Sequence, residues 1–557
     1  MIMDKTGNVR HHRKMKALTR KERIDRLAGK NTFRNPILPG FYPDPSICRV
    51  GDDYYMATST FEYFPGVPIF HSKDLVHWRQ LGHVLNRPSQ LNLDGIPCSK
   101  GIYAPTLRYH NGVFYMITTM VESATSERKN FFVTATDPAG PWSEPYWLKD
   151  APGIDPSLFF DDDGKAYYTG NRKPPSGQQY PKHMEIWLQE LDLTTKQLVG
   201  PKYSLWDGAL KLAHAQEGPH LYKVDGWYYL LIAEGGTGFT HAVTVARSQS
   251  VTGPYEPCKM NPILTHRHLG KDYGIVNVGH ADIVETQNGE WWMVCLASRP
   301  YGGPYRNMGR ETFLVPMAWE NGWPVVNPGK GVVEWESVRP NLPERRWPAL
   351  PACDNFDAPE LDLRWNFIRT PRGDFWSLSE RPGYLRLRLK PETTTGTDNP
   401  SFVGRRQQHM SFAARTALEF SPCSENEAAG MILLQSSDFQ YRLECGMSGD
   451  AAEIRLVMRE QGEERVLASR PLPSVSEQEP ARLYLKAEAI GQSYHFYYAA
   501  AAEVWETLYE DADGTILSTD KAGGFVGTYV GLFASANGRT SSNYADFDWF
   551  EYLPIED

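Results

Sequence analysis

Two stretches of the chain carry the same tripeptide: GIDPSL at residues 153–158 and FYPDPSI at residues 41–47. In both, Asp-Pro-Ser is followed by a turn and then by two adjacent aromatic residues. These pairs are Tyr54–Tyr55 and Tyr167–Tyr168. The shared flanks indicate an internal repeat, and a repeat determines how single strands are grouped into a fold.

The turn and its aromatic pair occur three more times, in NGVFYMITT, DGWYYLLIA and NGEWWMVCL. An Asn-Gly or Asp-Gly turn between apolar runs is the strongest short-range signal for a β-hairpin, because both central residues need a positive φ. Intervals of 60, 53, 61 and 63 residues separate the second aromatics, Tyr55, Tyr115, Tyr168, Tyr229 and Trp292. The sequence therefore predicts five repeated units, each built on a hairpin.

The strand before each hairpin has one equivalent position, 11 to 13 residues ahead of the second aromatic. Further strands are expected after each hairpin, for example at 71–78, 134–142 and 245–255. Units of about four strands around an axis form a β-propeller, which commonly has about four to eight blades. We therefore expect an all-β chain with a five-bladed β-propeller. Its central channel would bring together Asp44, Ala104, Asp155, Glu217 and His280.

A chain of 557 residues exceeds what one hydrophobic core usually supports. We predict a basic N-terminal extension (1–34), a propeller (35–335), a Pro-rich linker (336–352) and a β-sandwich (353–557). The sandwich is indicated by alternating apolar and polar residues in segments such as 384–390 and 439–445. A supporting role is favoured for it, and a sugar-binding role stays open.

Composition narrows the class of protein. The seven cysteines have no spacing typical of a disulfide framework or a metal site. No apolar run has the ~20 residues of a membrane span, and no signal-peptide region is recognised, so a cytoplasmic location is expected. The first 34 residues hold eleven Lys and Arg against three Asp and Glu, whereas the whole chain has a net charge of −9. The acidic remainder argues against nucleic acid as a partner.

Three carboxylates that converge on one channel suit glycoside hydrolysis. Like charges in proximity raise the pKa of one another's carboxyl groups, so at least one group is expected to be partly protonated near neutral pH. One carboxylic acid can then protonate the leaving oxygen, and one carboxylate can activate water. A separation of about 6.5–9.5 Å gives inversion, and about 5–5.5 Å gives a retaining nucleophile. The alternative for Asp44 and Asp155 is that they only cap local turns.

Several motifs resemble glycoside hydrolase family 43, the β-xylosidase and α-L-arabinofuranosidase group. They are NPILPGFYPDPSI, STFEYFPGVPIFHSKDLVHW, GIYAPTLRY, QEGPHLYK, AEGGTG and GRETFL, and the resemblance runs from about Asn35 to Asp557. It implies a five-bladed propeller followed by a sandwich, and hydrolysis with inversion. It also implies Asp44 as general base, Glu217 as general acid and Asp155 as the residue that tunes the acid.

The resemblance implies substrate-binding roles for five more residues. Arg310 in GRETFL would grip sugar hydroxyls, or be a surface charge. Phe61 would line the terminal-sugar pocket, and Phe525 of the sandwich would close it, unless both are core aromatics. Tyr103 stands where many β-xylosidases have tryptophan, and this difference favours the arabinofuranosidase branch of the family. His280 would lie near a central water or metal ion, or be structural.

The resemblance thus implies an exo-acting, inverting enzyme that releases terminal β-D-xylosyl or α-L-arabinofuranosyl residues from xylo- or arabino-oligosaccharides. No cofactor is required and no protein-ligated metal site is expected. A structural Ca²⁺, reached by His280 through water, and a homo-oligomer stay open. Two alternatives are a retaining β-fructosidase-like hydrolase, whose Asn-Asp-Pro-Asn motif is missing here, and a non-catalytic carbohydrate-binding protein. Neither nucleic acid nor a membrane is an expected partner.

Overall fold

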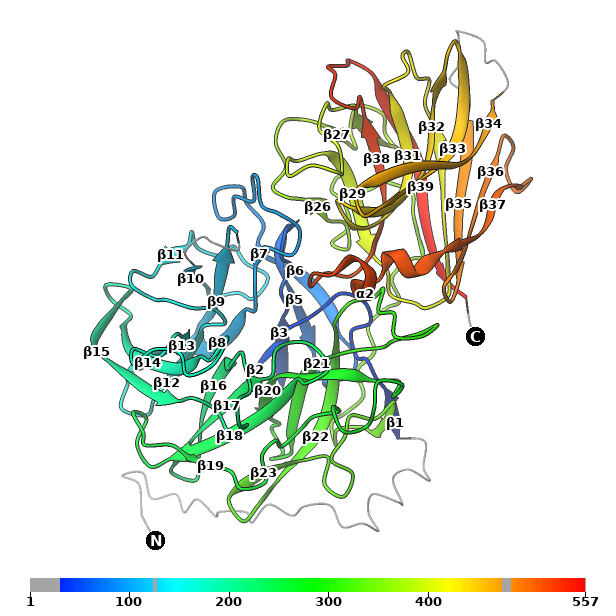
Figure 1. Cartoon of the computed structure of the whole chain (residues 1–557). Coiled ribbons are helices and arrows are strands. Elements are labelled where there is room, and N and C mark those ends of the chain that lie inside the picture. The colour runs from blue at the N-terminus through cyan, green and yellow to red at the C-terminus, as the bar shows by residue number, and fades with distance from the viewer. Residues whose placement is uncertain (1–30, 124–127, 473–481, 556–557) are drawn as a thin grey trace.

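The computed structural model describes residues 31–123, 128–472 and 482–555. Within these ranges the regular structure is almost entirely β, since the helical elements are a 3₁₀ turn, η1 (Gly514–Leu517), and one short helix, α2 (Thr519–Ala522). The prediction of an all-β chain is confirmed. Figure 1 shows two bodies, with α2 beside their junction. Residues 1–30 of the predicted basic extension lie outside the described residues.

Five antiparallel sheets follow one another through the first body. The first contains β2 (Ser46–Val50), β3 (Asp53–Ala57), β5 (Gly66–Ser72) and β6 (Arg79–Leu85). The second contains β8 (Thr106–His110), β9 (Val113–Val121), β10 (Arg128–Ala135) and β11 (Tyr146–Trp147), with β7 (Gly101–Ile102) also on β9. The third contains β12 (Ser157–Phe160), β13 (Ala166–Arg172), β14 (Glu185–Asp192) and β15 (Gln197–Trp206).

The last two sheets have the same serial order. The fourth contains β16 (Glu217–Val224), β17 (Trp227–Glu234), β18 (Ala242–Ser248) and β19 (Glu256–Pro257). The fifth contains β20 (Val276–Glu285), β21 (Trp291–Ser298), β22 (Glu311–Glu320) and β23 (Trp323–Val326). Each repeated unit of the sequence therefore corresponds to one sheet.

The hairpins predicted from the repeat join the first two strands of each sheet. The turn between β8 and β9 has φ values of 49° at Asn111 and 84° at Gly112, and the turn between β16 and β17 has 49° at Asp225 and 81° at Gly226. These are the positive values that such two-residue turns require. The first strands of successive sheets contact one another, and β2 also contacts β20, so the first strands form a closed ring.

The second body is a β-sandwich of two sheets, as expected. One sheet contains β27 (Trp376–Ser377), β28 (Leu385–Arg388), β39 (Tyr544–Pro554), β30 (Phe412–Glu419), β35 (Arg482–Ile490), β36 (Ser493–Ala499) and β37 (Glu506–Asp513), with β25 (Cys353–Asp354) on β39. The other contains β29 (Ser401–Arg406), β38 (Tyr529–Ser535), β31 (Ala428–Ser436), β32 (Phe439–Ser448), β33 (Ala451–Glu460) and β34 (Glu463–Pro471). Alternate side chains of β35 are buried, which matches the period of two in its sequence.

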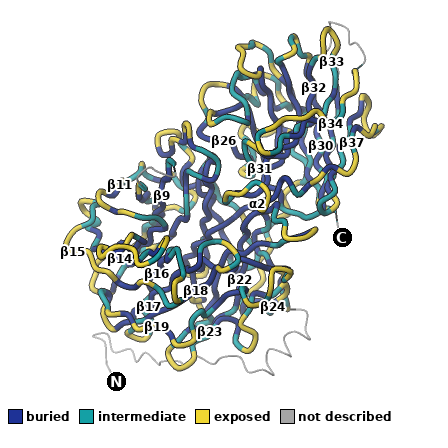
Figure 2. The backbone as a smooth tube through the Cα atoms, in the orientation of Figure 1, coloured by how far each residue is buried: buried dark blue, intermediate teal, exposed yellow. Residues whose placement is uncertain are grey.

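The two bodies are joined by buried polar and apolar contacts. Strand β4 (Tyr63–Phe64) pairs with β26 (Phe367–Ile368), so one small sheet spans the junction. The buried Arg369 donates from Nε to the carbonyl oxygen of Ile96 at 2.6 Å. One hydrophobic cluster also continues from the first two sheets into the sandwich. Figure 2 shows this junction largely as buried backbone.

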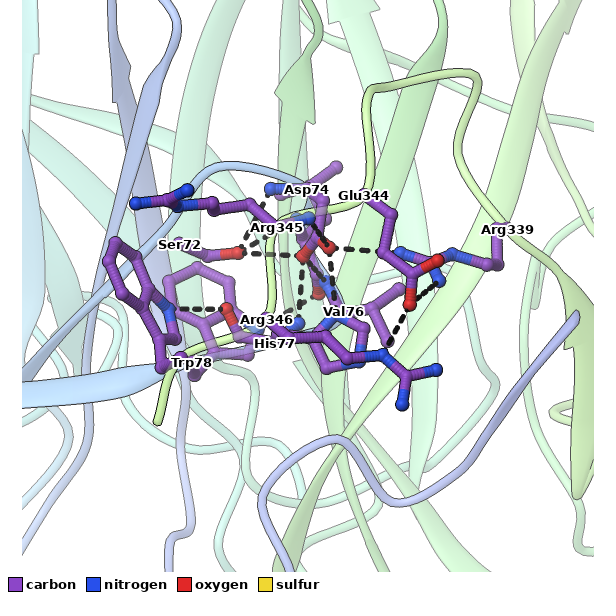
Figure 3. A network of polar contacts seen from close by, with 11 residues as sticks. Ser72, Asp74, Val76, His77, Trp78, Arg339, Glu344, Arg345 and Arg346 are labelled. Carbon is purple, nitrogen blue, oxygen red and sulfur yellow. Dashed lines mark hydrogen bonds and ion pairs between the residues drawn. The ribbon is translucent and has the colours of Figure 1, made fainter. Parts of the chain in front are cut away.

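The segment between the two bodies is held against the first body. Strand β24 (Glu336–Val338) pairs with β1 (Thr32–Arg34). Farther along, Arg339 donates from Nη2 to Asp74 at 2.9 Å and the backbone N–H of Arg345 donates to the same oxygen at 2.9 Å. Figure 3 shows these groups gathered around the Asp74 carboxylate. Residues of the predicted linker are therefore held against the first body.

The seven cysteines are all free thiols. Within the described ranges, no helix is long and apolar enough to cross a bilayer.

Candidate active site

The repeat places three side chains at equivalent backbone positions with the same unusual conformation. Asp44, Asp155 and His280 have φ values of 54°, 53° and 43°. Asp44 and Asp155 lie just before β2 and β12, and His280 lies within β20. Left-handed conformations of non-glycine residues cost free energy and collect at functional sites. Their recurrence in three units indicates that the backbone is built to direct these side chains.

Glu217 reaches the same region through a local irregularity. It is the first residue of β16, and the register between β16 and β17 shifts between Glu217 and His220. The intervening Gly218 has a φ of 58°, and a Cβ atom there would lie 3.0 Å from Nε2 of His280. Irregularities of this kind re-aim side chains in sheets. Glycine at 218 thus allows the fourth unit to approach His280 of the fifth.

His280 lies between the two aspartates. Its Nδ1 is 3.7 Å from Oδ1 of Asp44 and 4.0 Å from Oδ2 of Asp155. Both aspartates are buried, with 4% and 6% of their surface exposed. Burial lowers the pKa of His280, so the imidazole is expected to be largely neutral near pH 7.

Two donors hold the carboxylate of Asp44. Nη1 of Arg310 donates to Oδ1 at 2.7 Å, and the hydroxyl of Ser59 donates to Oδ2. Both residues are buried. The charge-assisted bond from a guanidinium is among the stronger hydrogen bonds in proteins, so the orientation of Asp44 is fixed.

The other two carboxyl groups have raised pKa values. Burial of its carboxyl group, followed by the charge of Asp44, raises the pKa of Glu217 to about 7, although the residue as a whole is half-buried. Burial, then the charges of Glu217 and Asp44, raises the pKa of Asp155 well above its usual value. The three carboxyl groups together therefore retain at least one proton near neutral pH.

Arg310 connects the carboxylates to an aromatic wall. Its guanidinium lies 5.4 Å from the ring centre of Phe61 and 5.7 Å from that of Phe525, within cation–π range. Nη1 also approaches the hydroxyl of Thr237 at 3.4 Å. Its Nε is buried and has no hydrogen-bond partner among the described residues. A buried donor without a partner is costly, and a sugar hydroxyl could satisfy it.

The three aromatic side chains predicted to line the pocket lie together. The ring centres of Phe61 and Tyr103 are 5.0 Å apart, and those of Phe61 and Phe525 are 5.9 Å apart. Tyr103 and Phe525 are 6.3 Å apart in an edge-to-face arrangement. Phe525 belongs to the second body, so residues of both bodies form this wall.

Sequence reasoning did not identify Ser99, which holds two of these aromatics. Its hydroxyl accepts a hydrogen bond from the backbone N–H of Phe525 at 2.8 Å, and its carbonyl accepts one from the Tyr103 hydroxyl at 3.2 Å. Its own N–H donates to the Glu62 carboxylate at 3.0 Å. Nothing in the repeat points to Ser99, because it lies in a loop between units.

Ser59 and Thr237 were also missed as site residues. Both lie in motifs that carry the family resemblance, STFEYFPG and AEGGTG, so the signal was present but was not resolved to these hydroxyls. Ala104, at the equivalent position of the second unit, is buried and carries no ionisable group. Among residues 31–123, 128–472 and 482–555, no three His, Cys, Asp or Glu side chains form a group that could hold a metal ion.

Comparison with known proteins identifies the family of the chain. Residues 33–324 match Glycosyl hydrolases family 43, and residues 353–553 match the Beta xylosidase C-terminal Concanavalin A-like domain. A xylosidase/arabinosidase of Butyrivibrio fibrisolvens is 50% identical over 93% of this chain and 98% of its own length. A non-reducing end alpha-L-arabinofuranosidase of Bacteroides ovatus is 42% identical over 95% of this chain and 96% of its own length.

A solved structure of a xylan beta-1,4-xylosidase from Bacillus halodurans superposes with a TM-score of 0.88 at 40% identity, covering 94% of this chain and 100% of that one. The matches span both bodies and nearly the full length of these relatives. The chain therefore belongs to glycosyl hydrolase family 43 and is a glycoside hydrolase.

Proposed function

We propose that this enzyme removes single pentoses from the non-reducing ends of xylo- or arabino-oligosaccharides, with inversion at the anomeric carbon. The observation that carries the proposal is the convergence of Asp44, Asp155 and Glu217 from three sheets beside Arg310. We further propose that the five sheets are the blades of a five-bladed propeller. The closed ring of first strands supports this arrangement.

In the proposed mechanism, Glu217 is the general acid. A carboxyl group with a pKa of about 7 is still substantially protonated near neutral pH and can donate to the glycosidic oxygen as the bond breaks. Asp44 is the general base that takes a proton from the attacking water. Hydrogen bonds from Arg310 and Ser59 fix the direction of its carboxylate.

Asp155 is proposed to tune the acid. Glu217 is among the charges that raise the pKa of Asp155, and the interaction is reciprocal, so an ionised Asp155 resists ionisation of Glu217. His280 lies within 4.0 Å of both aspartates and would keep them apart. No step of this mechanism needs a cofactor.

The aromatic wall supports action on chain ends. Phe525 reaches from the sandwich to stack on Phe61, and a pocket closed on one side by Phe61, Tyr103 and Phe525 suits a terminal sugar. The sandwich would therefore help to form the site as well as to support the propeller. The names of the relatives support both β-xylosyl and α-L-arabinofuranosyl residues as the sugar removed.

The test is product analysis with oligosaccharides whose reducing ends have been reduced to alditols. An exo-acting enzyme releases free xylose or arabinose stepwise from xylotetraitol or from an arabinofuranosyl-substituted alditol, and shortens the chain by one unit at a time. Release of internal fragments would contradict exo action. Binding of both substrates without any product would support the carbohydrate-binding alternative instead.

A further inference from the structure

A second layer of polar side chains lies one step along the strands from the proposed catalytic residues. In three units, the residue of this layer follows the proposed site residue by two positions in the sequence. Ser46 follows Asp44, Ser157 follows Asp155, and Asp282 follows His280. These residues lie on the first strands of their sheets, and the first strands form the closed ring described above. Thr106 follows Ala104 in the same way, and His220 follows Glu217 by three because of the register shift.

Hydrogen bonds link this layer around the ring. The hydroxyl of Ser46 donates to Asp282 at 2.7 Å, and that of Thr106 donates to the carbonyl of Pro156 at 2.9 Å. The hydroxyl of Ser157 lies 3.3 Å from Nδ1 of His220. These contacts join the first unit to the fifth, the second unit to the third, and the third unit to the fourth, two or three residues along the chain from the catalytic positions.

The guanidinium of Arg108, from β8, completes the layer. Nη1 donates to Asp282 at 2.7 Å and to Ser46 at 3.2 Å, and Nη2 lies 2.9 Å from Nδ1 of His220. Since arginine can only donate, Nδ1 of His220 is the acceptor and its proton is on Nε2. One side chain of the second unit thus bonds to the first, fourth and fifth.

The Arg108–Asp282 pair is almost fully buried, with 15% and 0% of the two side chains exposed. Asp282 also accepts from the backbone N–H of Ile47 at 3.0 Å and from the hydroxyl of Tyr222. Apolar residues of similar volume often stabilise a fold as well as or better than a buried ion pair. A polar axis is therefore better explained by a need for fixed geometry than by a need for stability.

We propose that Arg108 and Asp282 are positioning residues that set the spacing of the catalytic carboxylates. The inference rests on the proposed roles of Asp44, Asp155 and Glu217. The planar guanidinium of Arg108 fixes the first strands of three sheets, β2, β16 and β20, relative to one another. Asp44 adjoins the first of these strands, and Glu217 and His280 lie on the other two. The same layer accounts for the serine in the duplicated Asp-Pro-Ser: in both copies it is a member of this ring.

The test uses the full chain with Arg108→Lys, Arg108→Met and the double variant Arg108→Met/Asp282→Asn. Lysine keeps the charge but not the fork, and the double variant removes both charges while keeping a side-chain oxygen at 282. Arg49→Ala is the matched control, because Arg49 lies on β2 and its Nη1 bonds only to the carbonyl of Gly51 among the described contacts. Thermal melting establishes that each variant is folded, and kcat and KM are measured on an aryl pentoside.

For folded Arg108→Lys and for the double variant, kcat falls by roughly 10- to 100-fold, because small misplacements of catalytic groups are costly. KM changes by less than about threefold, because the aromatic wall is untouched. The double variant regains melting temperature relative to Arg108→Met but not kcat. Arg49→Ala matches the wild type in both.

Two results distinguish the possible failures. If the wild type turns over the pentoside and folded Arg108→Lys has the same kcat as the wild type, the positioning role is overturned but the proposed function is not. A wild type without turnover of any pentoside would overturn the proposed function and this inference with it. If Arg108→Met does not fold, kcat of Arg108→Lys and of the double variant still tests the positioning role.

Discussion

Asp44, Asp155 and Glu217 occupy equivalent positions in the repeat but differ in their surroundings. Asp44 is held by Arg310 and Ser59, whereas burial and neighbouring charges raise the pKa values of Asp155 and Glu217. Different surroundings are what separate acid and base roles among chemically similar groups. The division of roles implied by the family resemblance is therefore compatible with the geometry.

Replacing Glu217 by alanine should lower activity according to the leaving group. Natural oligosaccharides need protonation of the leaving oxygen, so their kcat should fall by about 10²- to 10⁴-fold. An aryl pentoside with a dinitrophenolate leaving group needs little protonation and should be affected much less. Asp44→Ala is the contrast, because loss of the base should slow both substrates. Equal losses on both substrates in Glu217→Ala would contradict its role as acid.

Replacing Asp155 by asparagine should move the alkaline limb of the pH–rate profile to lower pH. Glu217 must be protonated to act, so activity is lost as pH rises through its pKa. The proposed mechanism has an ionised Asp155 beside a protonated Glu217, so the amide would remove a negative charge that resists ionisation of Glu217, and the pKa of Glu217 should fall. The measurement is kcat/KM against pH, with Asp163→Asn, on the exposed turn between β12 and β13, as control. An unmoved limb would show that Asp155 does not tune the acid.

The three carboxylates could be found from the sequence because they recur at fixed distances from a hairpin. Ser99 could not, because it lies in a loop whose course depends on the packing of several units. Ser59 and Thr237 lie in motifs that carry the family resemblance, but nothing in those motifs marks their hydroxyls as site groups. Arg108 lies within GIYAPTLRY, but the sequence gives no sign of its contacts, because its partners come from three other units.

At the scale of elements, the hairpins follow from local sequence, whereas the connections between bodies do not. The two-residue strands β4 and β26 have no pattern that would reveal their pairing. The segment of residues 339–347 contains arginines and prolines typical of an exposed connector, yet Arg339 is buried against Asp74 (Figure 3). Composition predicted its extended form, and only the packing reveals its anchor.

Asp74→Ala should destabilise the fold strongly. It would leave the buried Arg339 with only the more exposed Glu344 as an ion-pair partner. It would also remove acceptors for the backbone N–H groups of Val76, His77 and Arg345. Loss of one partner of a buried ion pair costs about 3–5 kcal/mol. Chemical denaturation measures the change, and Glu190→Ala, which breaks the exposed pair with Lys165, should have little effect. Equal stability of the two variants would contradict the anchoring role.

The same contacts give a pH dependence. Burial alone would raise the pKa of Asp74, but hydrogen bonds from His77, Arg345 and Val76 outweigh it and hold the pKa below its usual value. The stabilisation is therefore complete above the unfolded-state pKa of ~3.9 and is lost as pH falls through the lower folded-state pKa. The difference in melting temperature between wild type and Asp74→Ala should accordingly shrink in strong acid. A constant difference down to that range would contradict this assignment.

At the scale of the whole molecule, the sandwich contributes Phe525 to the aromatic wall of the site. Phe525 precedes β38, is bonded to Ser99 of the first body, and stacks on Phe61. The sequence left open whether this residue was only core packing, because its partners are more than four hundred residues away along the chain.

Phe525→Ala should weaken binding of the terminal sugar more than it slows chemistry. Removing a large aromatic contact loses roughly 1.5–3 kcal/mol of apolar burial, which corresponds to about a 10- to 100-fold rise in KM if the contact is made equally in the ground and transition states. Tyr544→Ala is the control, since this tyrosine is exposed on β39. Unchanged KM in Phe525→Ala would place Phe525 outside the pocket.

The central claim is that Asp44 activates water for a single displacement, with Glu217 as the acid. A proton NMR time course with the purified enzyme, xylobiose and an α-L-arabinofuranosyl oligosaccharide tests it most directly. Inversion predicts that the first xylose appears as the α anomer and the first arabinose as the β anomer, before mutarotation. First products with retained configuration would contradict the claim, because Asp44 or a neighbour would then have to act as a nucleophile.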